Sequence, residues 1–297
     1  ASAWFVSTAN AWMNSPAGFE MIEGRVENVD PIAAMLNAYH PMQTTHMLVA
    51  AYMVAGFSVA SYYAVRRLWG DRTEYNRRGL LLGLALGVFF TPVQMVVGDW
   101  AAKVVAKNQP VKLAAMEGQF TTEQGAPLRI GGLPDESART TRYALEIPRM
   151  LSFLAHGSFE AEVLGLEEFP EEDWPPVAIV HIAFQIMVGC GTLLLVLALL
   201  CCVYWIRRRP LPEAQWFLLF TALGGPLAIL ALEAGWVVTE VGRQPWIVQG
   251  VMRTREAATA APGVVTVFVA TLAIYAAIGL AAAVVLRMLA RKPRQVE

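Results

Sequence analysis

The chain has 297 residues, of which 56% are hydrophobic and only 16% are charged, and its formal net charge is −1. A mean hydropathy of +0.45 is too high for an ordinary soluble domain, so the composition predicts an integral membrane protein. The near-neutral charge argues against a nucleic-acid-binding surface, which needs basic residues to neutralise phosphates.

The first predicted element is the opening stretch ASAWFVSTANAWM, which we interpret as the outer end of a helix. It lacks the charged start and the cleavage site of a signal peptide, and we expect the protein to have further residues upstream of it. Five later segments are long and apolar enough to cross about 30 Å of hydrocarbon as helices. They are residues 45–65, 79–98, 178–206, 216–240 and 263–286.

Arginine and lysine residues orient these spans. Basic clusters follow the first, third and fifth full spans, at residues 66–78, 207–209 and 287–294. By the positive-inside rule these places are cytoplasmic, so the long segment 99–177 and the connection 240–262 are expected on the outer side. The three cysteines, all within the third span, have neither CxxC nor CxxCH spacing and are interpreted as buried thiols.

His46 and Met187 fall on the same predicted side of the membrane. Taken alone, His46 is typical of an interfacial histidine, and Met187 is typical of core packing. Together they have a second interpretation, as the two axial ligands of one low-spin haem. His181 precedes Met187 by six residues, about 600° of helix rotation, and is interpreted as interfacial. His40 and His156 are expected outside the spans, without a role.

The run ALEAGWVVTEVGRQPW, residues 231–246, places ionisable groups at the end of an apolar helix. Glu233, Trp236, Glu240 and Arg243 are spaced by three, four and three residues, so a helix would line them along one face. Glu240 and Arg243 could form a plain interfacial ion pair. Alternatively, Glu240 binds a metal or haem iron, Trp236 stacks on a ring and Arg243 pairs with propionates. Glu233 is a candidate proton-handling group, because burial would raise its pKa.

Lys112 and Glu117 lie in the string QPVKLAAMEGQF of the outer segment. On a regular helix they diverge by roughly 140°. One interpretation is a solvated amphipathic segment. The other is a quinol site, where a carboxylate accepts a proton during oxidation and a lysine polarises an oxygen.

These strings resemble subunit I of the cytochrome bd quinol oxidases. The matching stretches are ANAWMNSP, the His46 segment, GDWAAKVVAKNQPVKLAAMEGQF, AFQIMVGCG and EAGWVVTEVGRQPW, in the order of that family. The resemblance implies an all-α polytopic bundle with an extended external quinol-binding loop. The corresponding division of the chain is 1–98 for the first transmembrane helices, 99–177 for the loop and 178–297 for three further helices.

The resemblance also implies roles for individual residues. His46 and Met187 match the axial ligands of haem b558, and Glu240 matches the ligand of haem b595. Trp236 matches the tryptophan near the haems, and Arg243 the arginine among their propionates. Lys112 and Glu117 match the quinol-binding pair.

The implied activity is that of an electrogenic, non-pumping quinol:oxygen oxidoreductase of the respiratory chain. In the family, quinol is oxidised at the outer face of the bacterial cytoplasmic (inner) membrane, and electrons pass through haem b558 to haem b595 and haem d, or a third haem b, to reduce oxygen to water. The implied partners are subunit II, as a heterodimer, a small accessory peptide and the lipid bilayer.

The chain departs from the family pattern in three respects. It has no counterpart of the family's N-terminal helices, which supply a haem d ligand and glutamates of the proton path. Its loop is short, ending near Pro175, as in the cyanide-insensitive branch. Gln185 stands where some members have an arginine, and the lost charge would lower the potential of haem b558. Two rival functions remain open: a haem-free transporter using the intramembrane charges, and a degenerate, non-catalytic oxidase subunit.

Overall fold

The computed structural model describes residues 2–291, with side chains to residue 288. The chain divides into two units at Glu256, and each is described by itself. The helices are, in chain order, α1 (Ser2–Asn14), α2 (Pro31–Met35), α3 (His40–Leu68), α4 (Glu74–Asn108), α5 (Pro110–Glu117), α6 (Met150–His156), α7 (Val177–Ile206), α8 (Gln215–Val241), α9 (Thr254–Ala257) and α10 (Val264–Arg291).

Among the described residues, five helices are long and apolar enough to span a membrane, which confirms the predicted number. They are α3, α4, α7, α8 and α10, and the opening stretch forms α1 as expected. The main difference is α4, which continues to Asn108 instead of ending at Gly98. Hydropathy marks where the apolar core ends, whereas a helix can continue into water. Here Asp99 and Lys103 form an ion pair one turn apart (2.6 Å), which suits an exposed helical continuation.

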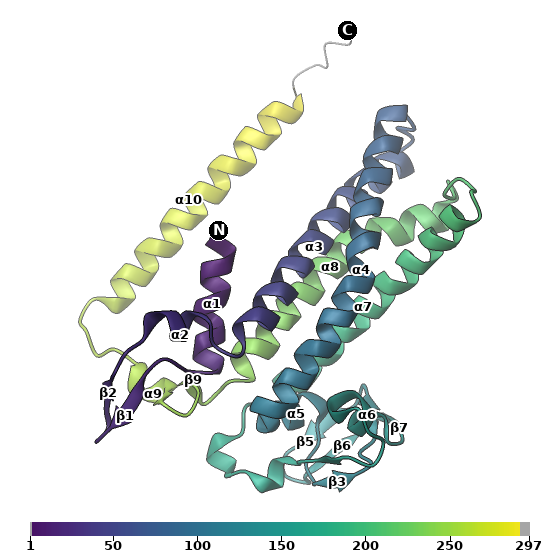
Figure 1. Cartoon of the computed structure of the whole chain (residues 1–297). Helices are drawn as coiled ribbons and strands as arrows, with labels where there is room; N and C mark the ends of the chain where they lie inside the picture. Colours follow the sequence, from purple (N-terminus) through teal and green to yellow (C-terminus); the bar gives the residue numbers. More distant parts are fainter. Residues whose placement is uncertain (1, 292–297) are drawn as a thin grey trace. The chain divides into compact units, whose positions relative to one another are not determined.

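Helices α3, α4, α7 and α8 form the bundle at the centre of the first unit (Figure 1). Their shared core is apolar and includes Phe57, Leu84, Leu197 and Phe217. Glycines allow α3 and α4 to approach closely, because a Cβ at Gly56 would overlap the backbone of α4. This is the small-residue packing that membrane helices use.

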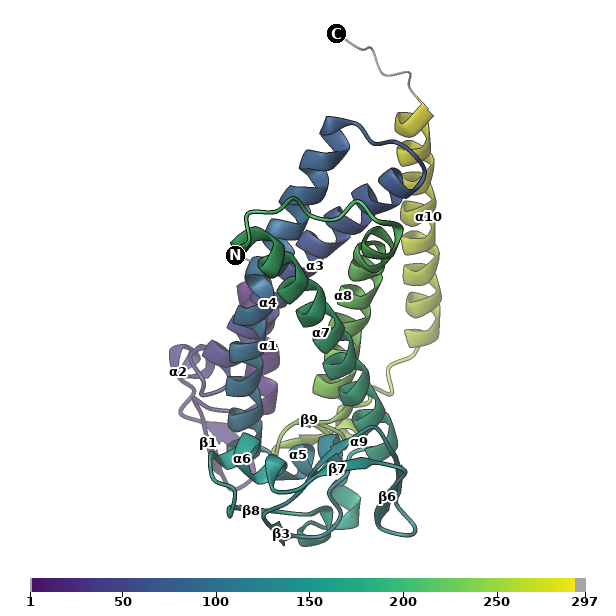
Figure 2. The ribbon, with the colours of Figure 1, turned by 90° about the vertical axis from the view of Figure 1, so that its right-hand side faces the viewer.

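The segment between α5 and α7, here called the loop, gathers at one end of the bundle (Figure 2). It folds as nested antiparallel pairs in which β3 pairs with β8, β4 with β7 and β5 with β6. The strands are β3 (Glu123–Gln124), β4 (Leu128–Ile130), β5 (Leu133–Asp135), β6 (Thr140–Arg142), β7 (Leu145–Ile147) and β8 (Glu162–Val163). Two 3₁₀ turns, η1 (Leu166–Glu168) and η2 (Glu171–Asp173), lead into α7. Two hairpins lie elsewhere: β1 (Glu20–Ile22) with β2 (Arg25–Glu27), and β9 (Trp246–Val248) with β10 (Met252–Arg253).

The opposite end of the bundle carries two of the three basic clusters, those at residues 66–78 and 207–209, whereas the third, at 287–294, is in the second unit and extends beyond the described residues. The turn from α3 to α4 and the connection from α7 to α8 meet at that end of the bundle, because the buried Arg67 forms an ion pair of 2.5 Å with Glu213. The two basic connections therefore share one end of the bundle, as the charge-based topology requires. In the second unit, α10 is apolar along its length, with a mean hydropathy of 2.4 in its candidate span.

Candidate haem and quinol site

A cavity of about 360 Å³ lies inside the bundle toward the loop end. Side chains from α1, α3, α4, α5, α7 and α8 line it. His46 on α3 and Met187 on α7 both face it, and so do Lys112 on α5 and Trp236 on α8. The predicted axial ligands therefore share one cavity with the predicted quinol lysine. The volume is within the range of small-molecule and cofactor sites.

His46 is held from the neighbouring helix by Gln94 on α4. The amide nitrogen of Gln94 lies 3.1 Å from Nε2 of His46. The amide oxygen of Gln94 is buried and has no hydrogen-bond partner among residues 2–288. The same amide nitrogen lies 3.4 Å from Nδ1 of His46, so if one ring nitrogen bound a metal, the side chain of Gln94 would remain beside the other and could fix the orientation of the ring.

Met187 packs against a glycine on α8. A Cβ placed on Gly235 would lie 3.2 Å from the sulfur of Met187. That separation is tighter than ordinary van der Waals contact, so only glycine leaves the thioether its present position. Gly235 in the sequence EAGWVV thus leaves space for Met187, and the next residue in the same string is Trp236.

Glu240 and Arg243 lie together where α8 ends. Nη2 of Arg243 donates to Oε2 of Glu240 at 2.5 Å, and Asn10 on α1 donates to the other carboxylate oxygen. The Arg243 side chain is 3% exposed, whereas that of Glu240 is 43% exposed. Burial lowers the pKa of Arg243, and the charge of Glu240 opposes that shift.

Two buried nitrogens of Arg243, Nε and Nη1, have no hydrogen-bond partner within residues 2–288. An unpaired buried guanidinium face is costly and suits an anionic group such as a propionate. The imidazole and thioether donors, the glycine beside Met187 and this open guanidinium all fit a haem.

Lys112 belongs to this same cluster. It is buried, and its ammonium donates to the side-chain oxygen of Asn14 and to the carbonyl of Thr239, both at 3.2 Å. Gly242 packs on the methylene stem of Lys112. Burial lowers the pKa of Lys112 to about 7; the positive charge of Arg243 acts in the same direction, and Glu240 opposes it. The lysine therefore titrates near physiological pH, where both its ammonium and its neutral amine are populated.

Glu117, five residues on, lies apart from that cluster. It is buried, and its Oε2 has no hydrogen-bond partner in the described part of the chain. Burial raises the pKa of Glu117 to about 8, and the positive charge of Arg129 in the loop opposes this shift. The interpretation of α5 as a solvated amphipathic segment is therefore wrong, since both titratable side chains are buried.

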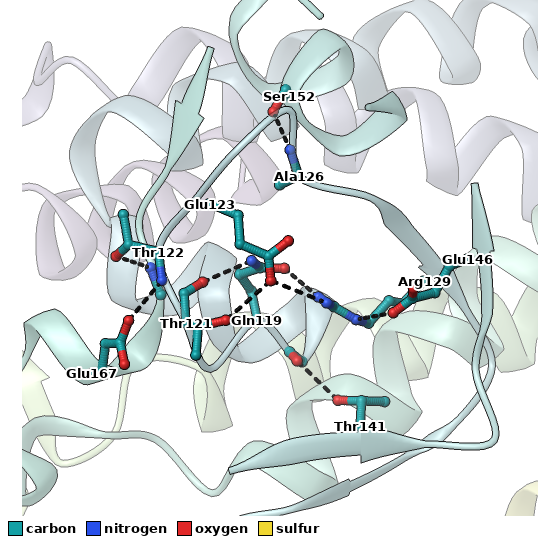
Figure 3. Close-up of polar contacts among 12 residues, drawn as sticks. Gln119, Thr121, Thr122, Glu123, Ala126, Arg129, Thr141, Glu146, Ser152 and Glu167 are labelled. Carbon is teal, nitrogen blue, oxygen red and sulfur yellow. Dashed lines mark hydrogen bonds and ion pairs between the residues drawn. The ribbon is translucent and has the colours of Figure 1, made fainter. Parts of the chain in front are cut away.

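Arg129 is fixed within the loop by a polar network (Figure 3). Its guanidinium donates to the amide oxygen of Gln119 and to Glu146 at 3.0 Å, and lies 3.6 Å from Glu123. The Arg129 side chain is only 12% exposed. A fixed cation thus lies beside the segment that follows Glu117.

Three sequence interpretations need correction in this chain. Glu233 is exposed on α8, because the buried positions of that helix, such as Ala231 and Ala234, face the bundle; the burial assumed for Glu233 is absent here. His181 is completely buried rather than interfacial. His40 begins α3 and is buried, with its Nδ1 shared between the hydroxyls of Thr8 and Thr44.

Several polar residues near the site were missed by the sequence argument. Asn10, Asn14 and Gln109 were not singled out, although each contacts a candidate residue or its neighbour. A signal existed for the two asparagines, which are four residues apart and so share one face of an apolar helix. Gln94 had no such signal, because its role depends on the packing of α3 against α4.

The fold and cavity define a polytopic membrane protein with a donor set for haem and buried acid–base groups beside it. Comparison with known proteins narrows this class. The family model for cytochrome bd terminal oxidase subunit I matches residues 1–294, and the chain belongs to that family.

The relatives are both named as subunit I of a cytochrome bd quinol oxidase, but their names give different quinols, menaquinol and ubiquinol. A Bacillus subtilis protein called "Putative cytochrome bd menaquinol oxidase subunit I" is 34% identical over 98% of this chain and 67% of its own length. Cytochrome bd-II ubiquinol oxidase subunit 1 of Escherichia coli is 28% identical over 87% of this chain and 63% of its own length. A solved bd oxidase structure from Geobacillus thermodenitrificans matches with a TM-score of 0.86 and 41% identity, covering 98% of this chain and 67% of that one. The chain thus spans roughly two thirds of the length of these proteins.

Proposed function

We propose that this chain acts within a quinol:oxygen oxidoreductase as the part of subunit I that oxidises quinol and holds haem. The observation that carries the proposal is that one cavity is lined by His46, Met187 and Lys112. An electron donor bound near Lys112 would therefore lie beside the two candidate ligands of a low-spin haem. The relatives named as quinol oxidases agree with this assignment.

His46 and Met187 would hold haem b558, and Glu240 would bind the iron of haem b595. Arg243 would pair with propionates through its two unpartnered nitrogens. Trp236 would contact a haem from the cavity wall. Bound haem supplies one-electron carriers and, as haem d or a third haem b, an oxygen-binding iron.

Glu117 and Lys112 would act on the quinol. Glu117 is five positions after Lys112, about 7.5 Å further along α5 and turned by roughly 140°, so one aromatic diol would contact both across the edge of this helix. The unpartnered Oε2 of Glu117 would accept a hydroxyl proton. Lys112, as the ammonium, would donate to the other oxygen and stabilise negative charge that develops there.

The remaining assignments follow from the family and from the charge pattern. The arginine clusters at one end of the bundle support a cytoplasmic position for that end, which puts the loop on the outer face of the bacterial inner membrane. Protons released there during quinol oxidation, with the protons for oxygen reduction taken up from the cytoplasm, would make the reaction electrogenic without a pump. Subunit II would be the partner in a heterodimer, with a small accessory peptide as a further subunit. Glu233, exposed on α8, would handle protons at a surface that another part of the oxidase covers.

The test uses the purified membrane complex. We expect a b-type signal in its reduced-minus-oxidised optical spectrum and quinol-dependent oxygen uptake. The His46→Ala, Met187→Ala double variant should lose the low-spin component. A complex without any b-type haem would instead indicate a transporter, and a haem-loaded complex unable to oxidise quinol would indicate a degenerate subunit.

A further inference from the structure

Two polar side chains at the loop end of α7 bind the backbone of the loop. Nδ1 of His181 lies 2.8 Å from the carbonyl oxygen of Met116, and its Nε2 lies 3.0 Å from the carbonyl oxygen of Gly131. The amide of Gly131 donates to Oε1 of Gln185 at 2.9 Å. Nε2 of Gln185 donates to the carbonyl of Arg129 at 3.0 Å.

His181 and Gln185 are four residues apart and therefore share one face of α7. Together they contact four backbone groups, on the last turn of α5, in β4 and at Gly131 directly after β4. His181 is completely buried, and apolar side chains such as Val177 and Val180 surround this part of α7. Buried backbone groups that lose a partner cost free energy, so apolar replacements cannot maintain this attachment.

The backbone atoms that are held belong to the neighbours of the proposed proton acceptor. Met116 immediately precedes Glu117, and Arg129 carries the charge that acts on the Glu117 carboxyl. The glycine after Glu117 lies against the same contact: Gly118 has a φ of +62°, and a Cβ there would overlap the hydroxyl of Thr141 and reach the His181 ring at ordinary contact distance. The same α7 face thus fixes both α5 and the backbone of Arg129.

We propose that His181 and Gln185, on the helix that carries Met187, are positioning residues for quinol oxidation. They hold the Glu117 carboxyl and the Arg129 guanidinium at a fixed position relative to each other. This inference rests on the proposed role of Glu117. Neither side chain touches the reacting atoms. Their effect is to keep the acceptor and its neighbouring cation in place while quinol binds.

The test replaces each residue in the whole complex by an apolar one, Gln185→Leu and His181→Phe. We expect kcat/KM for quinol to fall about tenfold in each, which corresponds to the loss of one net hydrogen bond. Oxidation of a one-electron dye that releases no proton, tetramethyl-p-phenylenediamine kept reduced by ascorbate, should not change. The His181→Gln variant, which retains an amide donor, should recover part of the loss.

The pH profile separates positioning from simple damage. The charged or titratable groups at the loop end of α5 and of the elements around it include Lys112, Lys103, Lys107, Arg129, Glu167, Glu168 and His181. Glu123 and Glu146 pair with Arg129, and Glu240 and Arg243 act on Lys112. Of these, Arg129 opposes the upward shift of the Glu117 pKa. A displaced Arg129 would oppose it less, so the acidic limb of kcat/KM should move to higher pH in Gln185→Leu.

Ile179→Ala provides a matched control, because Ile179 is on the same helix end and is exposed. It should behave as the parent protein. Parental kinetics and an unmoved pH limb in both apolar variants would overturn the proposal. Equal loss of quinol and dye oxidation would also overturn it, because that result indicates general unfolding of the loop. Failure of the proposed function is distinct, since the unmodified complex would then not oxidise quinol at all.

Discussion

The Glu117→Gln substitution tests the quinol chemistry most directly. Glutamine has the shape of the glutamic acid but cannot accept a proton, and Glu117 is buried with an unpartnered oxygen, so no neighbouring group replaces it. A positioned general base contributes about 10²- to 10⁴-fold. We expect kcat for quinol to fall by about that factor, whereas haem content is unchanged.

The pH dependence of kcat/KM gives a second test of the roles of Glu117 and Lys112. Glu117, with a pKa of about 8, becomes an effective base as the pH rises through that value. Lys112, with a pKa of about 7, loses its charge as the pH rises through that lower value. Because the two groups act in opposite senses, kcat/KM should be bell-shaped with its maximum between about 7 and about 8. Glu117→Gln should remove the acidic limb, and Lys112→Met the alkaline one.

The assay is oxygen uptake with a soluble quinol, corrected for autoxidation of the quinol at each pH. Glu160→Gln is the control, because Glu160 makes an exposed ion pair with Arg149 elsewhere in the loop. Its profile should match that of the parent. An acidic limb that persists in Glu117→Gln would refute the assignment of Glu117 as the proton acceptor.

Three further variants test the cavity. Gly235→Val should displace the sulfur of Met187, change the low-spin haem spectrum and destabilise the protein by about 1–3 kcal/mol. The control is Gly189→Ala, where a Cβ meets open space and none of these changes is expected. An unchanged spectrum in Gly235→Val would argue against Met187 as a ligand. Arg243→Gln should lower the haem content measured by pyridine haemochrome, and Arg243→Lys should not restore it, because lysine lacks the planar fork. Gln94→Leu should shift the midpoint potential of the low-spin haem through lost contact with His46, as measured by redox titration; a parental potential would exclude that contact.

Features that depend on one physical property could be predicted from the sequence. Span number follows from apolar length, and the shared end of the arginine clusters follows from charge. The surroundings of individual side chains could not be predicted, because they depend on which elements pack against a helix. Periodicity predicts that Glu233, Trp236 and Glu240 share one face of α8, but in the fold Trp236 lines the cavity, Glu240 contacts Asn10 on α1, and Glu233 is exposed.

The loop shows the same limit more sharply. Its strands have two or three residues each, too few for an alternating pattern to be recognised. His181 looked interfacial because it begins an apolar span, yet the loop folds over it and buries it completely. The sequence around a histidine at a helix end does not indicate which backbone carbonyls will contact its ring in the folded protein.

The two sides of α5 suggest how charge separation arises under the proposed function. Lys112 faces the cavity with His46 and Met187, whereas Glu117 belongs to the side where the loop supplies Arg129. An electron leaving a quinol between them would move into the bundle, and the proton would move to the loop. Arg129 is in turn paired with Glu146, whose side chain is 52% exposed at the surface of the loop. Under the proposed function, opposite directions for the electron and the proton at this short helix would contribute to charge separation without a proton-pumping element.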